Sequence, residues 1–203
     1  MRILVPIYCL ILLSACGGGD QSAPAASAPV ASVEGYDLQA ISGSSLQKAT
    51  KKDDAGVVIE EGTMLNNQRS GTWTTYYPAN SRVKSMSTYV NGLKNGKHIE
   101  MNDRGQVELE ANYVDDVLDG PWTKYKFGSR KSKEVFYKMG VIDQFYREYH
   151  NTGKLMKDIQ YKDGKMHGYF KQYDDKQKLL MEYQYENGQK VSGGIVQDGG
   201  AAE

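Results

Sequence analysis

The residue types that most often carry out chemistry are sparse in this sequence, which has three histidines, two cysteines and a scatter of carboxylates. His98, His150 and His167 stand at different places within a repeating pattern, so the fold is not expected to gather them into one site. The run His98-Ile99-Glu100 matches the opening of a zinc deaminase motif, but the sequence lacks the Pro-Cys-x-x-Cys that completes it. Glu108 and a carboxylate on a neighbouring strand could transfer protons, although acidic residues on a solvent face usually serve solubility. We therefore expect a protein with no enzymatic activity, no cofactor and no metal.

Cys16 is the side chain for which the sequence indicates a covalent modification. Residues 1–15 join a basic start at Arg2 to a short apolar run, which is typical of a secretory signal and too short to span a bilayer. The run Leu13-Ser14-Ala15-Cys16 resembles a bacterial lipobox, and this resemblance implies cleavage before Cys16 and attachment of a diacylglyceryl group to its sulfur. A disulfide with Cys9 is the alternative, but Cys9 lies in the segment that would be removed.

A lipid on Cys16 predicts a location in the cell envelope. Several acyl chains, at about 0.8 kcal/mol for each buried methylene, would anchor the chain durably in a membrane. Gly17 rather than Asp after the cysteine resembles the sorting pattern of Gram-negative lipoproteins released to the outer membrane. In such a host the protein would face the periplasm.

The rest of the chain divides by composition. Residues 16–32 are small, Pro-punctuated and nearly uncharged, which predicts a flexible tether after the lipidated cysteine. Residues 33–56 form an N-terminal cap or loop: the apolar side chains around Tyr36 suit a capping strand or short helix, and Lys48 to Asp54 suit a solvated loop. We predict a repeat domain over residues 57–196 and a flexible tail over residues 197–203.

The chemistry that the sequence does favour is recognition by aromatic rings. Fifteen tyrosines against four phenylalanines is unusual, and rings with a polar tip suit half-wet interfaces. The alternative is a cross-strand ladder that only stabilises a one-layer sheet. We favour that alternative for the regularly repeated Tyr89, Tyr113, Tyr137, Tyr161 and Tyr185. The candidate binding surface is formed by Trp73, Tyr76, Trp122, Tyr125, Tyr149 and Tyr173.

A repeat of 24 or 25 residues must position these rings. Each unit starts at Gly71, Gly96, Gly120, Gln144 or Gly168, with a large or cyclic side chain two residues later and Tyr or Met three further on. In the second half of each unit, as in residues 107–113, apolar and polar residues alternate with period two, which predicts a strand with one buried face. Residues 58–64 continue the pattern as a half-unit before Gly71, and Gly193 restarts it with Ile195 at the aromatic position.

Turn residues close the units at both ends. Asn91-Gly92, Asp163-Gly164 and Asn187-Gly188 predict tight hairpin turns, because asparagine and glycine tolerate positive φ at little cost. The predicted fold is therefore all-β: a repetitive antiparallel hairpin meander of about eleven strands, at ~4.8 Å spacing, in a single curved and elongated sheet.

The units resemble a known family in their opening and closing residues. The G-x-W-x-x-Y opening, as in Gly71, Trp73 and Tyr76, and the Tyr-x-x-Gly close, as in Tyr89 to Gly92, resemble the bacterial variant of the MORN repeat found in proteins labelled YwqK-family antitoxins. The resemblance covers residues 57–192 and implies a scaffold of β-hairpins that serves as an interaction surface.

The balance of charges and the order of the predicted segments limit the classes of function that we expect. Lys and Arg balance Asp and Glu at 25 each, so a nucleic-acid partner, which usually needs a basic excess, is not expected. We expect a lipid-anchored, non-catalytic scaffold that binds a protein partner in the envelope. The alternatives are an antitoxin or immunity protein that binds a toxin, and a cell-wall glycan binder or glycan-active enzyme. The sequence leaves the partner and the oligomeric state open.

Overall fold

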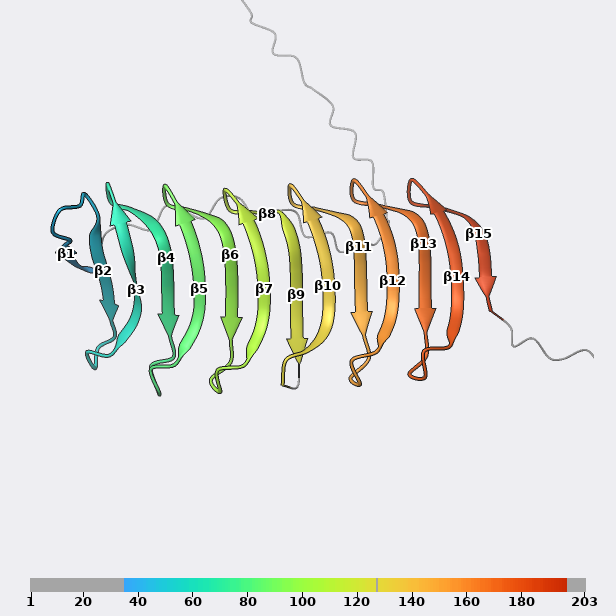
Figure 1. Cartoon of the computed structure of the whole chain (residues 1–203), viewed down its shortest axis with the longest axis horizontal. Coiled ribbons are helices and arrows are strands. Elements are labelled where there is room, and N and C mark those ends of the chain that lie inside the picture. The colour runs from blue at the N-terminus through green and yellow to red at the C-terminus, as the bar shows by residue number, and fades with distance from the viewer. Residues whose placement is uncertain (1–34, 127, 197–203) are drawn as a thin grey trace, which may run out of the picture.

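The computed structural model describes residues 35–126 and 128–196, and over these residues the chain is all-β. Fifteen strands form one open antiparallel sheet in meander order, as Figure 1 shows; the short β8 lies off this path and, like β9, pairs with β7. The strands are β1 (Asp37–Ala40), β2 (Gln47–Lys52), β3 (Val58–Leu65), β4 (Gln68–Tyr76), β5 (Val83–Val90), β6 (Leu93–Met101), β7 (Val107–Val114), β8 (Val117–Leu118), β9 (Gly120–Lys126), β10 (Arg130–Lys138), β11 (Val141–Tyr149), β12 (Leu155–Lys162), β13 (Lys165–Tyr173), β14 (Leu179–Glu186) and β15 (Gln189–Ile195).

The predicted meander is confirmed, but the prediction of about eleven strands was too low. Residues 47–52, which include the lysines expected in a solvated loop, form β2 and pair with β3. Alternation explains this, because Ala49 points inward with no exposed surface while the neighbouring Lys48 faces solvent. The predicted signal segment, the lipidated Cys16, the tether of residues 16–32 and the tail of residues 197–203 lie outside the described residues.

The hairpin turns follow the predicted chemistry. Asn91 and Gly92 have φ of 49° and 83°, and Asn187 and Gly188 have φ of 50° and 86°. Two successive residues with positive φ define the type I′ turn, whose twist matches that of the flanking strands. Met139 takes the same place with φ of 48°, so the sheet imposes this turn even on a side chain that does not favour it.

A bulge marks the start of each repeat unit. Gly168 has φ of 100°, and the register of β13 against β12 shifts between Ile159 and Tyr161. Gln144 occupies the same place in β11 and also has a positive φ, at 61°. The bulge is therefore kept where the glycine is missing, at the cost of a left-handed conformation in a residue with a Cβ atom.

The sheet has two faces, which we name by their rings. Because side chains alternate along a strand, Trp73 and Tyr76, three residues apart in β4, point to opposite sides. The tryptophan face carries Trp73 and Trp122, and the tyrosine face carries Tyr76, Tyr125, Tyr149 and Tyr173.

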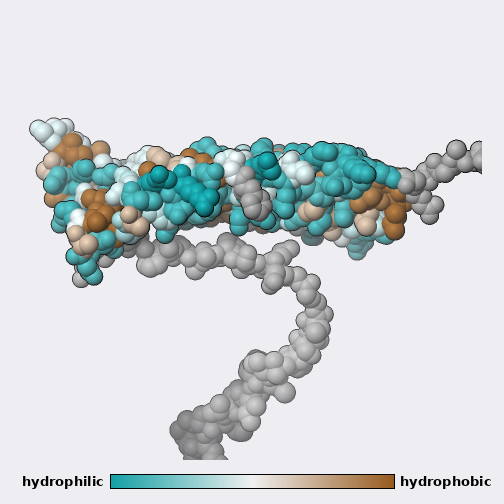
Figure 2. Space-filling view, turned by 90° about the horizontal axis from the view of Figure 1, so that it is seen from below, coloured by the Kyte–Doolittle hydropathy of each residue, from teal (hydrophilic) through white to brown (hydrophobic). Residues whose placement is uncertain are grey.

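The core lies on the tryptophan face near the N-terminal end. Ala49, Met64, Trp73 and Tyr89 form a buried cluster, against which Tyr36 and Leu38 pack. The residues before and within β1 thus supply a cover that a single-layer sheet otherwise lacks. In Figure 2 the body is elongated, with hydrophobic surface gathered toward its ends and hydrophilic surface between them.

Large and small side chains alternate across the tryptophan face near its N-terminal end, whereas the neighbours of the later rings are large. Trp73 lies against Gly62 of β3, where an added Cβ would be 2.4 Å from the indole, and faces Ser87 of β5. Further along, Phe170 faces Ile159 on one side and Tyr183 on the other.

The last strand departs from this pattern. Gly193, not Ile195, lies opposite Tyr183 at the ring position, so the predicted place of Ile195 was wrong. The ring row ends at β14.

Candidate functional site

The six residues of the predicted binding surface do not form one surface. Trp73 and Trp122 lie on the tryptophan face, and the four tyrosines lie on the tyrosine face. The sequence already implies this division, because each tyrosine lies three residues after the ring position of its strand. Two side chains three residues apart along a strand point to opposite faces.

Trp73 is a core residue, so its prediction as part of a binding surface was wrong. Its side chain is only 2% exposed, and its Nε1 donates a hydrogen bond to the Thr63 carbonyl oxygen at 3.0 Å. The ring meets Tyr36 edge-on at 5.5 Å between centroids, and the Arg69 guanidinium lies 4.4 Å from its centre. Because these contacts bury the indole, a partner protein cannot pack against it.

Trp122 remains half-buried on the same face, in β9. It pairs in register with Val135 of β10, which is 1% exposed. The indole therefore covers a core valine and keeps part of its surface in solvent.

The tyrosine face repeats a pair between a tyrosine and a carboxylate fifteen residues earlier. The Tyr76 hydroxyl donates to Glu61 Oε1 at 2.6 Å, and the Tyr149 hydroxyl donates to Glu134 Oε2. Tyr125 stands in the same relation to Glu110 in the sequence.

The pairs shift the pKa values of both partners. Desolvation and the hydrogen bond to Glu61 raise the pKa of Tyr76 to about 12. Burial raises the pKa of Tyr149 in the same way, with Glu134 adding to the effect. Burial disfavours the charge on Glu134, but the hydrogen bonds from Lys131 and Tyr149 outweigh it, so the pKa of that carboxyl is lowered. The carboxylates stay ionised at neutral pH and hold the phenols in place.

Tyr173 departs from the pattern. The carboxylate fifteen residues before it, Asp158, accepts hydrogen bonds from Arg147 Nε at 3.0 Å and from the Tyr169 hydroxyl at 3.1 Å. Tyr173 itself accepts one from His150 Nε2 through its backbone oxygen, at 3.1 Å.

Ion pairs cross the tyrosine face between adjacent strands and within β10. Their charges cancel locally, and each exposed pair contributes on the order of 0–1 kcal/mol. The pairs, with N–O distances between 2.5 and 3.5 Å, are Lys48–Glu61, Lys97–Glu110, Lys131–Glu134, Arg147–Asp158 and Lys171–Glu182.

The sequence reasoning missed a second set of rings on the tyrosine face. Phe136 and Phe145 have centroids 6.1 Å apart, and the Arg147 guanidinium lies 4.5 Å from the centre of Phe145. The signal was present as adjacent aromatic pairs, Phe145-Tyr146 and Tyr169-Phe170, because consecutive residues of a strand must serve both faces.

The histidines are spread over different elements, as expected from the sequence. His98 is 6% exposed on the tryptophan face, with Nδ1 2.7 Å from Ser87 Oγ and Nε2 3.0 Å from Glu100 Oε1. This side chain takes a ring position of the repeat, and both of its nitrogens are satisfied. In the described part of the chain, no three His, Cys, Asp or Glu side chains are grouped as a metal site would require.

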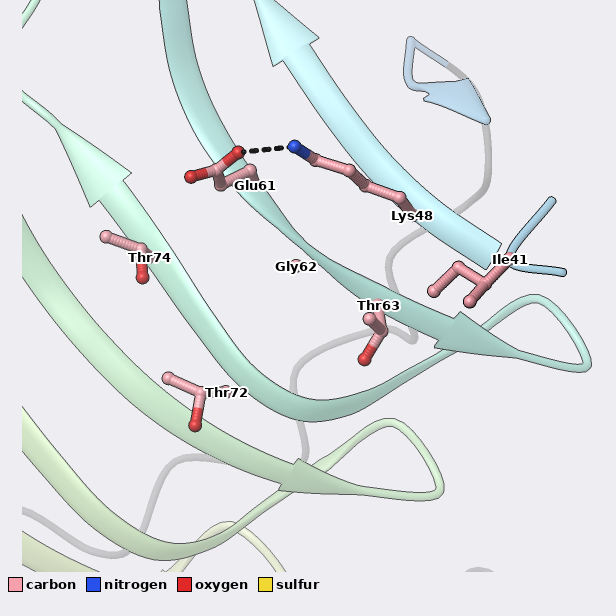
Figure 3. A pocket seen from close by; sticks show the side chains of 7 residues that line it. All are labelled: Ile41, Lys48, Glu61, Gly62, Thr63, Thr72 and Thr74. Atoms are coloured by element: carbon pink, nitrogen blue, oxygen red, sulfur yellow. Dashed lines mark ion pairs between the residues drawn. The ribbon is translucent and has the colours of Figure 1, made fainter. Parts of the chain in front are cut away.

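Two open hollows flank Glu61 on the tyrosine face. The first, about 390 Å³, is shown in Figure 3, where Thr63, Thr72 and Thr74 surround Gly62, and the Lys48 ammonium lies 3.3 Å from Glu61. The second, about 370 Å³, is lined by Val57, Val58, Glu61, Tyr76 and Ser81.

Within residues 35–126 and 128–196 no helix has the length and apolar composition needed to cross a bilayer. In comparisons with known proteins, no family model matches the chain, and no curated protein is significantly similar to it.

Proposed function

We propose that the mature chain is a lipid-anchored, non-catalytic scaffold of the cell envelope, held in the membrane through Cys16 and binding a partner protein through the tyrosine face. The main support is that a single sheet layer leaves this face uncovered, with half-buried tyrosines along it. Rings with a polar tip, set among charges that already have partners, resemble the composition of protein interfaces.

The paired charges also bear on the kind of partner. Because lysines and arginines on this face pair with carboxylates in the sheet, the surface offers no strong net charge to attract a polyanion. A partner protein would gain binding free energy instead by packing on the rings of Tyr125 and Tyr149 and by forming hydrogen bonds with polar groups around them. The regular bulges and the period of the units support our further proposal that the array is of the MORN-like type.

Site-specific photocrosslinking tests the proposed surface. A benzophenone amino acid in place of Tyr149 reports on the tyrosine face, and the same residue in place of Tyr161 reports on the tryptophan face as a matched control. We expect one discrete adduct in the native envelope from position 149 and none from position 161. Equal adducts from both positions, or an adduct from position 161 alone, would contradict the proposal.

The anchor is tested separately. Radiolabelled palmitate should enter the wild-type protein, and Cys16→Ser should abolish both the label and recovery in the membrane fraction. Retention of the variant in that fraction would refute the assignment of Cys16.

A further inference from the structure

The two hollows beside Glu61 lie at the N-terminal end of the sheet, around β3 and β4. On β4 the tyrosine face carries Thr72 and Thr74, one and three residues after the unit's starting glycine. The equivalent residues of β11 are Phe145 and Arg147, whose stacked side chains fill that space. Short side chains on β4 thus leave open a surface that larger ones close on β11.

The lining exposes more apolar than polar surface and is nearly neutral. Three threonines and Ile41 line the first hollow, and the Lys48–Glu61 ion pair, at 3.3 Å, cancels its own charge. The Glu61 side chain is 34% exposed and that of Lys48 is 53% exposed, so both remain accessible to a ligand. A site with paired charges and several hydroxyls suits a neutral ligand rich in hydroxyl groups.

The position within the sheet limits how a ligand can be recognised. β3 pairs with β2 on one side and with β4 on the other, so its backbone groups are engaged in ladders. An extended peptide would need free backbone donors and acceptors, which an interior strand does not offer. Recognition therefore falls to side chains, with the Glu61 carboxylate between the hollows and the Tyr76 ring beside the second.

We propose that these hollows bind a neutral glycan chain, with one sugar unit in each, the Glu61 carboxylate accepting sugar hydroxyls between them, and the Tyr76 ring packing on a sugar face. Each volume lies at the lower end of the roughly 300–1,000 Å³ typical of small-molecule sites, which suits one ring. This site does not depend on the proposed protein partner, which would use the tyrosine face farther along the sheet.

Titration with neutral tetrasaccharides tests the proposal. The probes are chitotetraose, cellotetraose and maltotetraose, added to the full mature chain with Cys16→Ser and followed by threonine methyl resonances. We expect at least one probe to bind with a dissociation constant in the millimolar range or tighter and to shift Thr72 and Thr74. Tetragalacturonate, which carries negative charge, should bind at least tenfold more weakly.

Variants separate this site from the rest of the face. Glu61→Gln and Thr72→Lys, which fills the first hollow, should each weaken binding at least tenfold. Glu134→Gln, which alters the equivalent pair with Tyr149 far from both hollows, should leave binding unchanged. Trp73 fluorescence, from the opposite face of β4, checks that each variant is folded. The proposal is overturned if no neutral probe binds, if binding survives both Glu61→Gln and Thr72→Lys, or if tetragalacturonate binds best.

Discussion

Gly62→Ala should destabilise the N-terminal end of the sheet by about 3 kcal/mol. The added Cβ would lie 2.4–2.6 Å from three indole atoms of Trp73, whereas carbon atoms normally approach to about 3.5–4.0 Å. The ring must therefore move by roughly 1 Å or more. Overpacking of this kind costs about 1–3 kcal/mol by itself.

The displaced ring would also lose its specific contacts. Its hydrogen bond to the Thr63 carbonyl is worth about 1 kcal/mol, and the edge-on contact with Tyr36 is worth about 0.5–1.5 kcal/mol. Partial loss of both, added to overpacking, gives the expected value. The tertiary contacts of the other repeat units, which reach only their neighbours, should be little affected.

Fluorine NMR of protein labelled with 5-fluorotryptophan resolves Trp73 from Trp122 during unfolding in guanidinium chloride. The Trp73 signal should unfold at a lower denaturant concentration in Gly62→Ala, while the Trp122 signal moves much less. Gly194→Ala is the matched control, because its Cβ would meet nothing within 4 Å. A Trp73 transition within about 0.5 kcal/mol of wild type, the range of neutral surface changes, would refute the reasoning.

Three further substitutions test other parts of the fold. Gln144→Gly should raise the unfolding free energy by about 0.5–1 kcal/mol, because the exposed Gln144 has φ of 61°; a loss of stability in chemical denaturation would show that the side chain matters more than the strain. Tyr149→Phe should cost about 1–2 kcal/mol at pH 7. Because the pKa of Glu134 is lowered by folding, that cost is present above the unfolded value of about 4.3 and should shrink as pH falls through the folded value; a cost independent of pH between 7 and 3 would exclude the carboxylate. Ser87→Ala should cost about 1–2 kcal/mol by leaving His98 Nδ1 unpaired, and adding His98→Phe should recover most of it in a double-mutant cycle; simple additivity would argue against the pair.

The meander could be predicted because its determinants are local. Period-two alternation over residues 107–113 and turn pairs such as Asn91-Gly92 specify strands and hairpins without reference to distant contacts. The hairpin of β1 and β2 was less legible because residues 33–56 do not repeat, so no second copy of the pattern supported the assignment. The lysines of residues 47–52 favour a loop, but in the structure this segment pairs with β3 and is a strand.

The candidate site was only partly predictable for a related reason. The spacing from Trp73 to Tyr76 already implied two faces, but the burial of Trp73 depends on Tyr36, which lies outside the repeat. The first hollow beside Glu61 is lined by the short side chains of Thr72 and Thr74, which meet Lys48 and Glu61 of neighbouring strands only in the folded sheet. A hollow formed by short side chains on adjacent strands is hard to predict from the sequence of a single repeat unit.

The residues beside the rings on the tryptophan face are small in the first units and large in the last, and this predicts a gradient of stability. The series, from β3 to β14, is Gly62, Ser87, Ala111, Val135, Ile159 and Tyr183. Against Gly62 the indole of Trp73 lies close to the backbone and is 2% exposed, whereas Phe170, between Ile159 and Tyr183, is only half-buried. The first ring is therefore shielded from water far better than the last.

Amide hydrogen exchange should be slowest in β3–β5 and fastest in β13–β15, because local opening costs least where few apolar contacts are lost. The cover over the first units makes a second test possible. Tyr36→Ala removes the ring that meets Trp73 at 5.5 Å and the hydroxyl that Arg69 donates to, so protection of β4 should fall toward that of β13. If wild-type protection were equal at both ends, or if Tyr36→Ala left β4 unchanged, the N-terminal cover and the graded row of side chains would not be what stabilises this sheet.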